Sequence, residues 1–401
     1  MLTSLAYVFL VGLAMASICQ RIKLPRIIGM LITGIVLGPF VLNLLDPTIL
    51  GISSELRRMA LIIILIKAGL SLDISDLKRV GRPAILMSFL PAVMELLAFV
   101  LLAPSLLHVT LLEAAIMGAV LGAVSPAVVV PKMVQLMETH YGTDKSIPQL
   151  ILAGASLDDV FVIVLFSTFV GMEQGGSASV MDFVNVPISI VLGIGLGVVV
   201  GIAIARFWEF EYNHGHLVRN SVKVIIILGM SFLLMAVETW LEGRIAVSGL
   251  LAVMSMACAI QMKSIESVVH RLSAKFGKLW LAAEVILFVL VGAAVDIRYT
   301  LEAGGMAILL ILLALVFRSI GVLICLIKTP LNMKERLFCV IAYIPKATVQ
   351  AAIGSVPLSL GLPCGKIVLS IAVLSIIITA PLGAFGMDVT YKRLLVKSES
   401  N

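Results

Sequence analysis

Long apolar blocks separated by short polar connectors recur along the whole chain, with no low-complexity tract between them. Each block approaches the roughly 20 residues that an α-helix needs to cross the hydrocarbon core of a bilayer. A segment in that environment must satisfy its own backbone hydrogen bonds, which favours helices. The pattern therefore predicts an all-α polytopic membrane protein with about thirteen transmembrane helices. The predicted spans are 2–18, 27–45, 57–72, 83–104, 110–131, 147–171, 184–205, 223–240, 246–262, 279–296, 303–327, 337–360 and 366–388.

Composition agrees with this prediction. Of the 401 residues, 61% are hydrophobic and only 13% are charged, and the mean hydropathy is +1.15. A soluble domain would carry about 25% charged residues. Length alone would predict two or three soluble domains, but here the bilayer sets the architecture. We therefore expect residues 1–401 to form one integral membrane unit.

The net charge of +6 reflects membrane topology rather than a nucleic-acid partner. Most of the 29 Lys and Arg residues fall in alternate connectors, for example in 21–26, 78–82 and 263–278. Cytoplasmic loops carry such an excess of Lys and Arg. We therefore expect a protein of the cell membrane, or of the inner membrane of a bacterium, with its N-terminus outside and its C-terminus in the cytoplasm. No positive residue precedes the first span, which predicts a retained helix and not a cleaved signal peptide.

The five cysteines are scattered, and none belongs to a CxxC pair. Neither a disulfide framework nor a structural metal site is indicated. We expect no cofactor.

The predicted spans contain a hidden repeat. Spans one to six and eight to thirteen are offset by an odd number, so corresponding helices cross in opposite directions, as in the inverted six-helix repeats of secondary transporters. The fifth member of each half is interrupted, by Ser125-Pro126 in the first and by Pro345 in the second. Proline in a helix interior costs about 3 kcal/mol. Simple kinks are one interpretation, but matched breaks favour two crossed, partly unwound helices whose ends direct partial charges at a bound ion.

Asp158 and Asp159 lie within the apolar span 147–171. A carboxylate at membrane depth is costly and calls for a cation, a proton or a basic side chain. Successive helix residues point about 100° apart, so one acid can line an aqueous cavity while the other faces a neighbouring helix. Burial and a neighbouring carboxylate both make an acid hold its proton more tightly, and carboxylate oxygens also suit small hard cations. The pair thus predicts a site where H⁺ competes with Na⁺ or Li⁺; the alternative is an acid within a buried polar network.

Further polar residues can support this site. Glu95 and Arg318 lie on corresponding spans of the two halves, and we predict that they form a buried ion pair. Lys346 follows Pro345 and can either exchange a proton or act as a fixed counter-charge for the carbonyls of the broken helix. Ser125 can offer a hydroxyl or a freed carbonyl to the ion, or simply belong to the kink.

Several strings in this chain resemble the NHA branch of the cation:proton antiporter superfamily, sodium/proton antiporters that carry a double-aspartate motif. The resemblance extends over nearly the whole chain from the second span onward. The matching strings are Leu65–Asp73, Gly122–Met133, Gly154–Asp159, Pro345–Val356 and Ile378–Gly383.

The resemblance implies an NhaA-like antiporter fold and a homodimer in the lipid bilayer, in which a mobile core moves like an elevator past a dimerisation panel. The panel would comprise 1–80 and 184–296, and the core 82–172 and 301–388. It also implies that Asp159 is the principal ion-binding acid and that Asp158 is engaged by a basic residue. Many electrogenic relatives have a lysine where this chain has Arg318, which keeps electroneutral exchange open.

We therefore expect a secondary active sodium (or lithium)/proton antiporter and not an enzyme. A sodium-coupled organic-anion symporter of the same general fold is the alternative, but it needs several Asn, Gln or Arg at midplane, and the spans are poor in these. An intramembrane aspartyl protease needs carboxylates that converge from two helices, whereas Asp158 and Asp159 are adjacent on one. A sensor on this scaffold would need an output domain, and we find none in the sequence.

Overall fold

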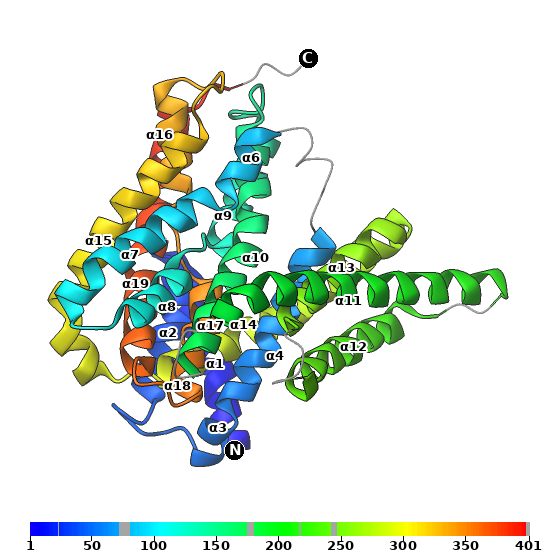
Figure 1. The fold of residues 1–401 in the computed structure, drawn as a ribbon, viewed down its shortest axis with the longest axis horizontal. Coiled ribbons are helices and arrows are strands. Elements are labelled where there is room, and N and C mark those ends of the chain that lie inside the picture. The colour runs from blue at the N-terminus through cyan, green and yellow to red at the C-terminus, as the bar shows by residue number, and fades with distance from the viewer. Residues whose placement is uncertain (23, 72–80, 175–179, 216–217, 242–246, 398–401) are drawn as a thin grey trace. The chain divides into compact units, whose positions relative to one another are not determined.

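The computed structural model describes residues 1–22, 24–71, 81–174, 180–215, 218–241 and 247–397 (Figure 1). Within these ranges the regular structure is helical, apart from one isolated β-bridge between Tyr141 and Lys397. The predicted all-α class is therefore confirmed. Among the described residues, seven helices are long and apolar enough to cross a membrane, and several shorter apolar helices accompany them.

The helices follow the predicted spans in order. The first half of the chain contains α1 (Leu2–Arg21), α2 (Arg26–Leu37), α3 (Pro47–Gly51), α4 (Ser53–Ser71), α6 (Arg82–Met87), α7 (Leu90–Leu107), α8 (Leu111–Leu121), α9 (Pro126–Glu138) and α10 (Ile147–Gln174). The second half contains α11 (Val180–Asn213), α12 (Asn220–Leu241), α13 (Gly249–Lys263), α14 (Glu266–Ala293), α15 (Ile297–Cys325), α16 (Met333–Ala342), α17 (Thr348–Ile353), α18 (Val356–Ser359) and α19 (Gly365–Leu394).

Prolines shape two of the predicted spans near their ends. The span 27–45 is too long, because α2 ends at Leu37 and Gly38 is extended before Pro39. A proline disfavours the helical conformation of the residue before it, and hydropathy alone does not register this. The span 83–104 is divided between α6 and α7, and Pro91 lies in the first turn of α7, where a missing N–H costs little.

The chain divides into two compact units. One comprises Met1–Glu55, Asp73–Glu173 and Val285–Asn401, and the other comprises Leu56–Leu72 and Gln174–Glu284. The first unit contains the whole of the expected core, 82–172 and 301–388. The division into core and panel stays a prediction, and residues 72–80 of the expected panel lie outside the described residues.

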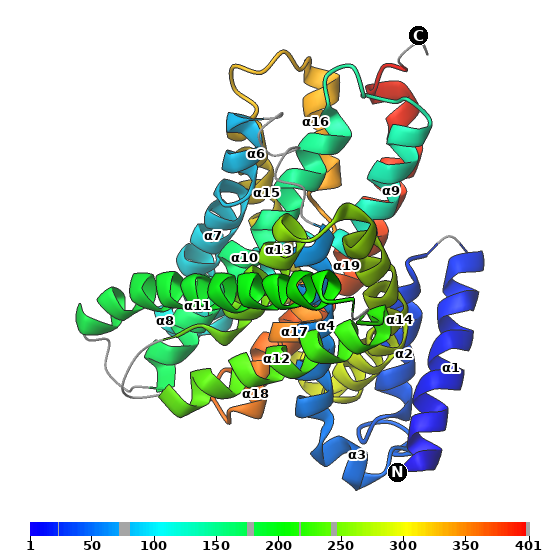
Figure 2. The same cartoon turned by 90° about the vertical axis from the view of Figure 1, so that its right-hand side faces the viewer.

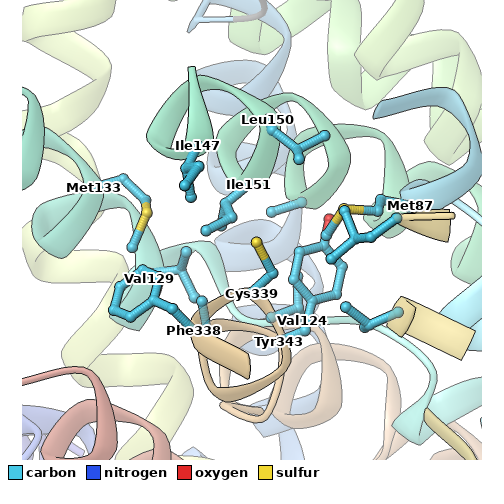
Figure 3. Close-up of a cluster of buried hydrophobic side chains, with 14 of the residues drawn as sticks. Met87, Val124, Val129, Met133, Ile147, Leu150, Ile151, Phe338, Cys339 and Tyr343 are labelled. Carbon is cyan, nitrogen blue, oxygen red and sulfur yellow. The ribbon is translucent and has the colours of Figure 1, made fainter. Parts of the chain in front are cut away.

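In the first unit, α7 packs along both α8 and α15, and α19 contacts α8, α9, α15, α16, α17 and α18 (Figures 1 and 2). A buried apolar cluster joins α6, α9, α10, α15, α16 and α19. Figure 3 shows part of it, with Met133, Ile151 and Phe338 packed together with Val124 and Tyr343. Val124 and Tyr343 each lie where a helix is interrupted, so the packing of this cluster holds the ends of the interrupted helices in place.

In the second unit, α11 lies against α13 through a stripe of glycines. A Cβ atom added at Gly197 would lie 2.2 Å from the carbonyl oxygen of Ala252, and one at Gly201 would lie 2.5 Å from that of Met256. Small residues at such positions let transmembrane helices approach closely. Gly195, on the same helix, has nothing within 4 Å of an added Cβ.

We predict that Gly197→Ala destabilises the protein and that Gly195→Ala does not. The methyl group at Gly197 must push α11 away from α13, and overpacking of this kind costs about 1–3 kcal/mol. The alanine at Gly195 meets open space and gains helix propensity. Thermal unfolding of the purified variants in detergent measures both effects. Equal melting temperatures for the two variants would contradict this packing.

Candidate ion-binding site

Two of the predicted spans are interrupted near their middle, as expected from their prolines. In the first, α8 ends at Leu121 and α9 begins at Pro126 after the N-cap residue Ser125. In the second, α16 ends at Ala342 and α17 begins at Thr348. We call residues 122–125 the first break and residues 343–347 the second break. Each break releases backbone N–H and C=O groups that need new hydrogen-bond partners in a membrane.

The two breaks bond to each other. The backbone N–H of Ser125 donates to the carbonyl oxygen of Pro345 at 2.8 Å. The side chain of Gln350, on α17, donates from Nε2 to the carbonyl oxygen of Ala123 and accepts from the N–H of Ala347, both at 2.8 Å. Gln350 is fully buried, and α17 contacts α8. One amide side chain therefore satisfies a freed group from each break.

Four charged side chains form a buried cluster beside the breaks. Glu95 Oε2 accepts from Arg318 Nη1 at 2.8 Å and from Lys346 Nζ at 2.7 Å. Arg318 Nη2 donates to Asp158 Oδ2 at 3.2 Å. None of these side chains is more than 2% exposed. The predicted ion pair of Glu95 and Arg318 is confirmed, and the four formal charges balance.

The same side chains hold the freed groups of the breaks. Arg318 donates from Nε to the carbonyl oxygen of Tyr343 at 2.7 Å and from Nη1 to that of Gly122. Lys346 Nζ donates to the carbonyl oxygen of Leu121. Asp158 Oδ2 accepts from the N–H of Val124 at 2.8 Å. Lys346 thus contacts both a carboxylate and a freed carbonyl, and whether it also exchanges a proton stays a prediction.

Asp159 differs from its neighbour. It is also buried, at 6% exposure, but no basic side chain in the described part of the chain pairs with it. Its Oδ1 atom has no hydrogen-bond partner there either. Adjacent residues on α10 thus lie in different surroundings, as the 100° helical step predicts. Asp158 belongs to the charge-balanced cluster, and Asp159 adds an unbalanced carboxylate.

Other buried oxygen atoms also lack partners among the described residues. Those at or beside the breaks include Asp158 Oδ1, Ser125 Oγ at the N-cap of α9, Thr348 Oγ1 at the start of α17, and the Tyr343 hydroxyl in the second break. Ser125 was expected at such a site, whereas Thr348 and Tyr343 were not. The signal for both was their position within or directly after a break in an apolar span. Within the described ranges, no group of three His, Cys, Asp or Glu residues could hold a metal ion.

Comparison with known proteins identifies the family. A family model described as "Sodium/hydrogen exchanger, transmembrane" matches residues 5–389. The chain belongs to the sodium/hydrogen exchanger family. It is similar to Sodium/hydrogen exchanger 9B2 of Homo sapiens and of Pongo abelii, in each case 34% identical over 388 residues that cover 94% of this chain and 71% of the relative. Sodium/hydrogen exchanger 9B1 of Mus musculus is 32% identical over 389 residues, which cover 94% of this chain and 67% of that relative.

The fold of this exchanger-family chain also has a solved counterpart. The sodium proton antiporter MjNhaP1 from Methanocaldococcus jannaschii at pH 8 superposes with a TM-score of 0.83 at 21% sequence identity, over 98% of each chain. The family model and the exchanger relatives, together with this shared fold, confirm the resemblance to the cation:proton antiporter superfamily. Together with the apolar helices, family membership makes this chain a multi-pass membrane protein.

We predict that Glu95→Gln strongly destabilises this exchanger-family protein. The substitution leaves Arg318 and Lys346 buried with Asp158 as their remaining carboxylate, and removal of one partner from a buried ion pair costs about 3–5 kcal/mol. Glu113→Gln is the matched control, because a glutamine at that position can still accept from the Thr110 N–H in the capping box of α8.

Thermal unfolding in detergent compares the two variants. The double variant Glu95→Gln/Lys346→Met should recover part of the lost stability, because it removes the second, unmatched charge. If Glu95→Gln unfolds at the same temperature as Glu113→Gln, Glu95 is not the counter-charge that the cluster requires.

Proposed function

We propose that this protein is a Na⁺ (or Li⁺)/H⁺ antiporter and that Asp159 carries the exchanged ion, with Asp158 beside it. Membership of the sodium/hydrogen exchanger family supports the activity. The observation that carries the site assignment is the contrast between the two acids. Asp158 is balanced by Arg318, whereas Asp159 is buried with no described cation.

The charge balance explains why exchange is obligatory. Glu95 and Asp158 offset Arg318 and Lys346, so the ionised carboxylate of Asp159 leaves the site with one net negative charge. A bound proton or a bound Na⁺ neutralises that charge equally well. An uncompensated charge at membrane depth is costly. The occupied site therefore changes the side of the membrane that it faces far more readily than the empty site. When Na⁺ leaves, a proton must take its place before the site can return, and when the proton leaves, Na⁺ must take its place.

The ligands of the metal ion would be hard oxygen atoms, as small cations prefer. We assign them to Asp159 and Asp158, with Ser125 and Thr348 completing the set from the two breaks. Each offers a buried oxygen with no partner in the described residues. In this assignment Lys346, Arg318 and Glu95 hold the breaks and do not touch the transported ion.

Alternating access would follow the scheme that the repeat predicts. The two halves form inverted six-helix repeats within about thirteen transmembrane helices, and the core, 82–172 and 301–388, moves past a panel made of 1–80 and 184–296. The protein would work as a homodimer in a cell or bacterial inner membrane, with its N-terminus outside and its C-terminus in the cytoplasm. The matched positions of the two breaks and the MjNhaP1-like fold support this scheme.

The alternative of a sodium-coupled organic-anion symporter gains no support from the site. An organic anion needs a cationic partner. Arg318 and Lys346 are the basic side chains at the breaks, and both are already engaged by Glu95 or Asp158 and by backbone carbonyls.

Proteoliposomes with an imposed proton gradient and a pH-sensitive dye test the proposal. We expect Na⁺ or Li⁺ to dissipate the gradient, and we expect Asp159→Asn to abolish this response because a neutral amide cannot exchange a proton for a cation. Asp158→Asn should weaken the response, since the variant loses a negative charge next to the ion and leaves Arg318 with less counter-charge. Glu173→Gln, near the end of the same helix, should respond as the wild type does.

Valinomycin and K⁺ set the membrane potential in the same assay. A response independent of potential is expected for one H⁺ per Na⁺. If folded wild-type protein responds to none of Na⁺, Li⁺ and K⁺, the antiporter proposal fails. If Asp159→Asn retains the wild-type response, the assignment of the ion to Asp159 fails.

A further inference from the structure

The string Ile378–Gly383 lies on α19, which contributes no side chain to the charged cluster described above. It nevertheless contacts the second break. The hydroxyl oxygen of Thr379 accepts a hydrogen bond from the backbone N–H of Lys346 at 3.0 Å, and Thr379 is fully buried. The residue that carries the counter-charge is thus held through its backbone by α19.

Three further contacts of the second break come from the site itself. Tyr343 is held by Arg318, Pro345 by the N–H of Ser125, and Ala347 by Gln350. Arg318, Ser125 and Gln350 belong to α15, the first break and α17, which the charged cluster and the hydrogen bonds between the breaks already join. Thr379 instead belongs to one continuous 30-residue helix. It therefore ties the second break to an element that is independent of the charged cluster.

Gly383 packs closely against Pro345, the residue before Lys346. It lies one turn after Thr379 on α19, and a Cβ atom added there would lie 2.3 Å from Cγ and 2.6 Å from Cδ of Pro345. The proline ring occupies the space that any larger side chain would need. Pro345 and Lys346 are therefore fixed from the same helix, one by its ring and the other by its amide.

We propose that Thr379 and Gly383 are positioning residues that fix the second break and thereby set the affinity of the site for Na⁺ relative to H⁺. The inference rests on the proposed antiport function. Lys346 lies in the held segment and Thr348 comes two residues after it, so a shift of this segment moves a counter-charge and a proposed ion ligand together. Na⁺ needs several oxygens in a fixed arrangement, whereas a proton needs one carboxylate. A looser break therefore weakens Na⁺ binding more than proton binding.

The test compares Thr379→Val, which keeps the shape and loses the acceptor, with Thr379→Ser, which keeps the hydroxyl. Ser375→Ala is the matched control, because Ser375 is a fully buried residue one turn earlier on α19 whose hydroxyl bonds to the Ala372 carbonyl of its own helix. Na⁺-dependent proton exchange is measured in proteoliposomes over a range of Na⁺ concentrations and pH.

Thr379→Val should raise the apparent KM for Na⁺ about tenfold with a nearly unchanged maximal rate, as expected when one buried hydrogen bond is lost. Its pH profile at fixed Na⁺ concentration should move to more alkaline pH. Na⁺ that binds more weakly can displace the proton only where the proton concentration is lower. Thr379→Ser and Ser375→Ala should retain the wild-type KM and profile. Wild-type values in Thr379→Val, or a Thr379→Ser that behaves like it, would overturn the proposal.

Gly383→Ala provides a second variant if Thr379→Val does not fold, and wild-type values in it would equally overturn the proposal. Hydrogen exchange at the Lys346 amide gives a readout that does not depend on transport. Thr379→Val should speed exchange there relative to Ser375→Ala, and equal rates would contradict the positioning role. A wild-type protein that exchanges no cation would instead contradict the proposed function and leave this amide measurement to decide the contact.

Discussion

The rest of the site depends on the ion pairs that the buried carboxylate of Glu95 forms with Arg318 and Lys346. One of its oxygens accepts from both Arg318 and Lys346, and all three side chains are almost completely excluded from solvent. A buried cation is tolerable only with a charge partner and satisfied hydrogen bonds. Glu95 supplies that partner for two cations at once, and Asp158 supplies the second negative charge for Arg318.

The broken helices depend on the same side chains. Arg318 and Lys346 donate to carbonyls that the breaks release, at Gly122, Tyr343 and Leu121. Asp158 accepts from an N–H that the first break releases. Charge balance and backbone satisfaction are therefore solved by one cluster. This leaves Asp159 as the carboxylate whose charge the described protein does not balance, which is the property that an exchange site requires.

Much of this arrangement could be predicted from sequence because it follows from local rules. Pro126 and Pro345 in apolar spans predict interrupted helices, and a lone acid and a lone base on corresponding spans predict the Glu95–Arg318 pair. The different surroundings of Asp158 and Asp159 follow from helix geometry. The end of α2 at Leu37 was missed because an apolar run conceals the Gly38-Pro39 signal.

The partners of the freed backbone groups could not be predicted in the same way. A released carbonyl can accept a hydrogen bond from, and a released N–H can donate one to, any buried side chain that the tertiary fold brings near. Sequence spacing does not say which side chain that is. The contacts of Gln350 with Ala123 and of Thr379 with Lys346 join residues far apart in the chain. The position of Thr348 after a break marks it in the sequence, but that its hydroxyl is buried without a partner in the described residues is seen only in the fold.

Proton release on Na⁺ binding to the purified protein tests most directly whether one unbalanced carboxylate holds either ion. The binding of Na⁺ in detergent is titrated in weakly buffered solution over a series of pH values, with wild type and Asp159→Asn compared. If Na⁺ displaces a proton from Asp159, binding releases protons, and the apparent affinity rises by about tenfold per pH unit where that acid is protonated. Asp159→Asn then neither binds Na⁺ tightly nor releases protons. Na⁺ binding of equal affinity at every pH, without proton release, or binding that persists in Asp159→Asn, would contradict competition at this site.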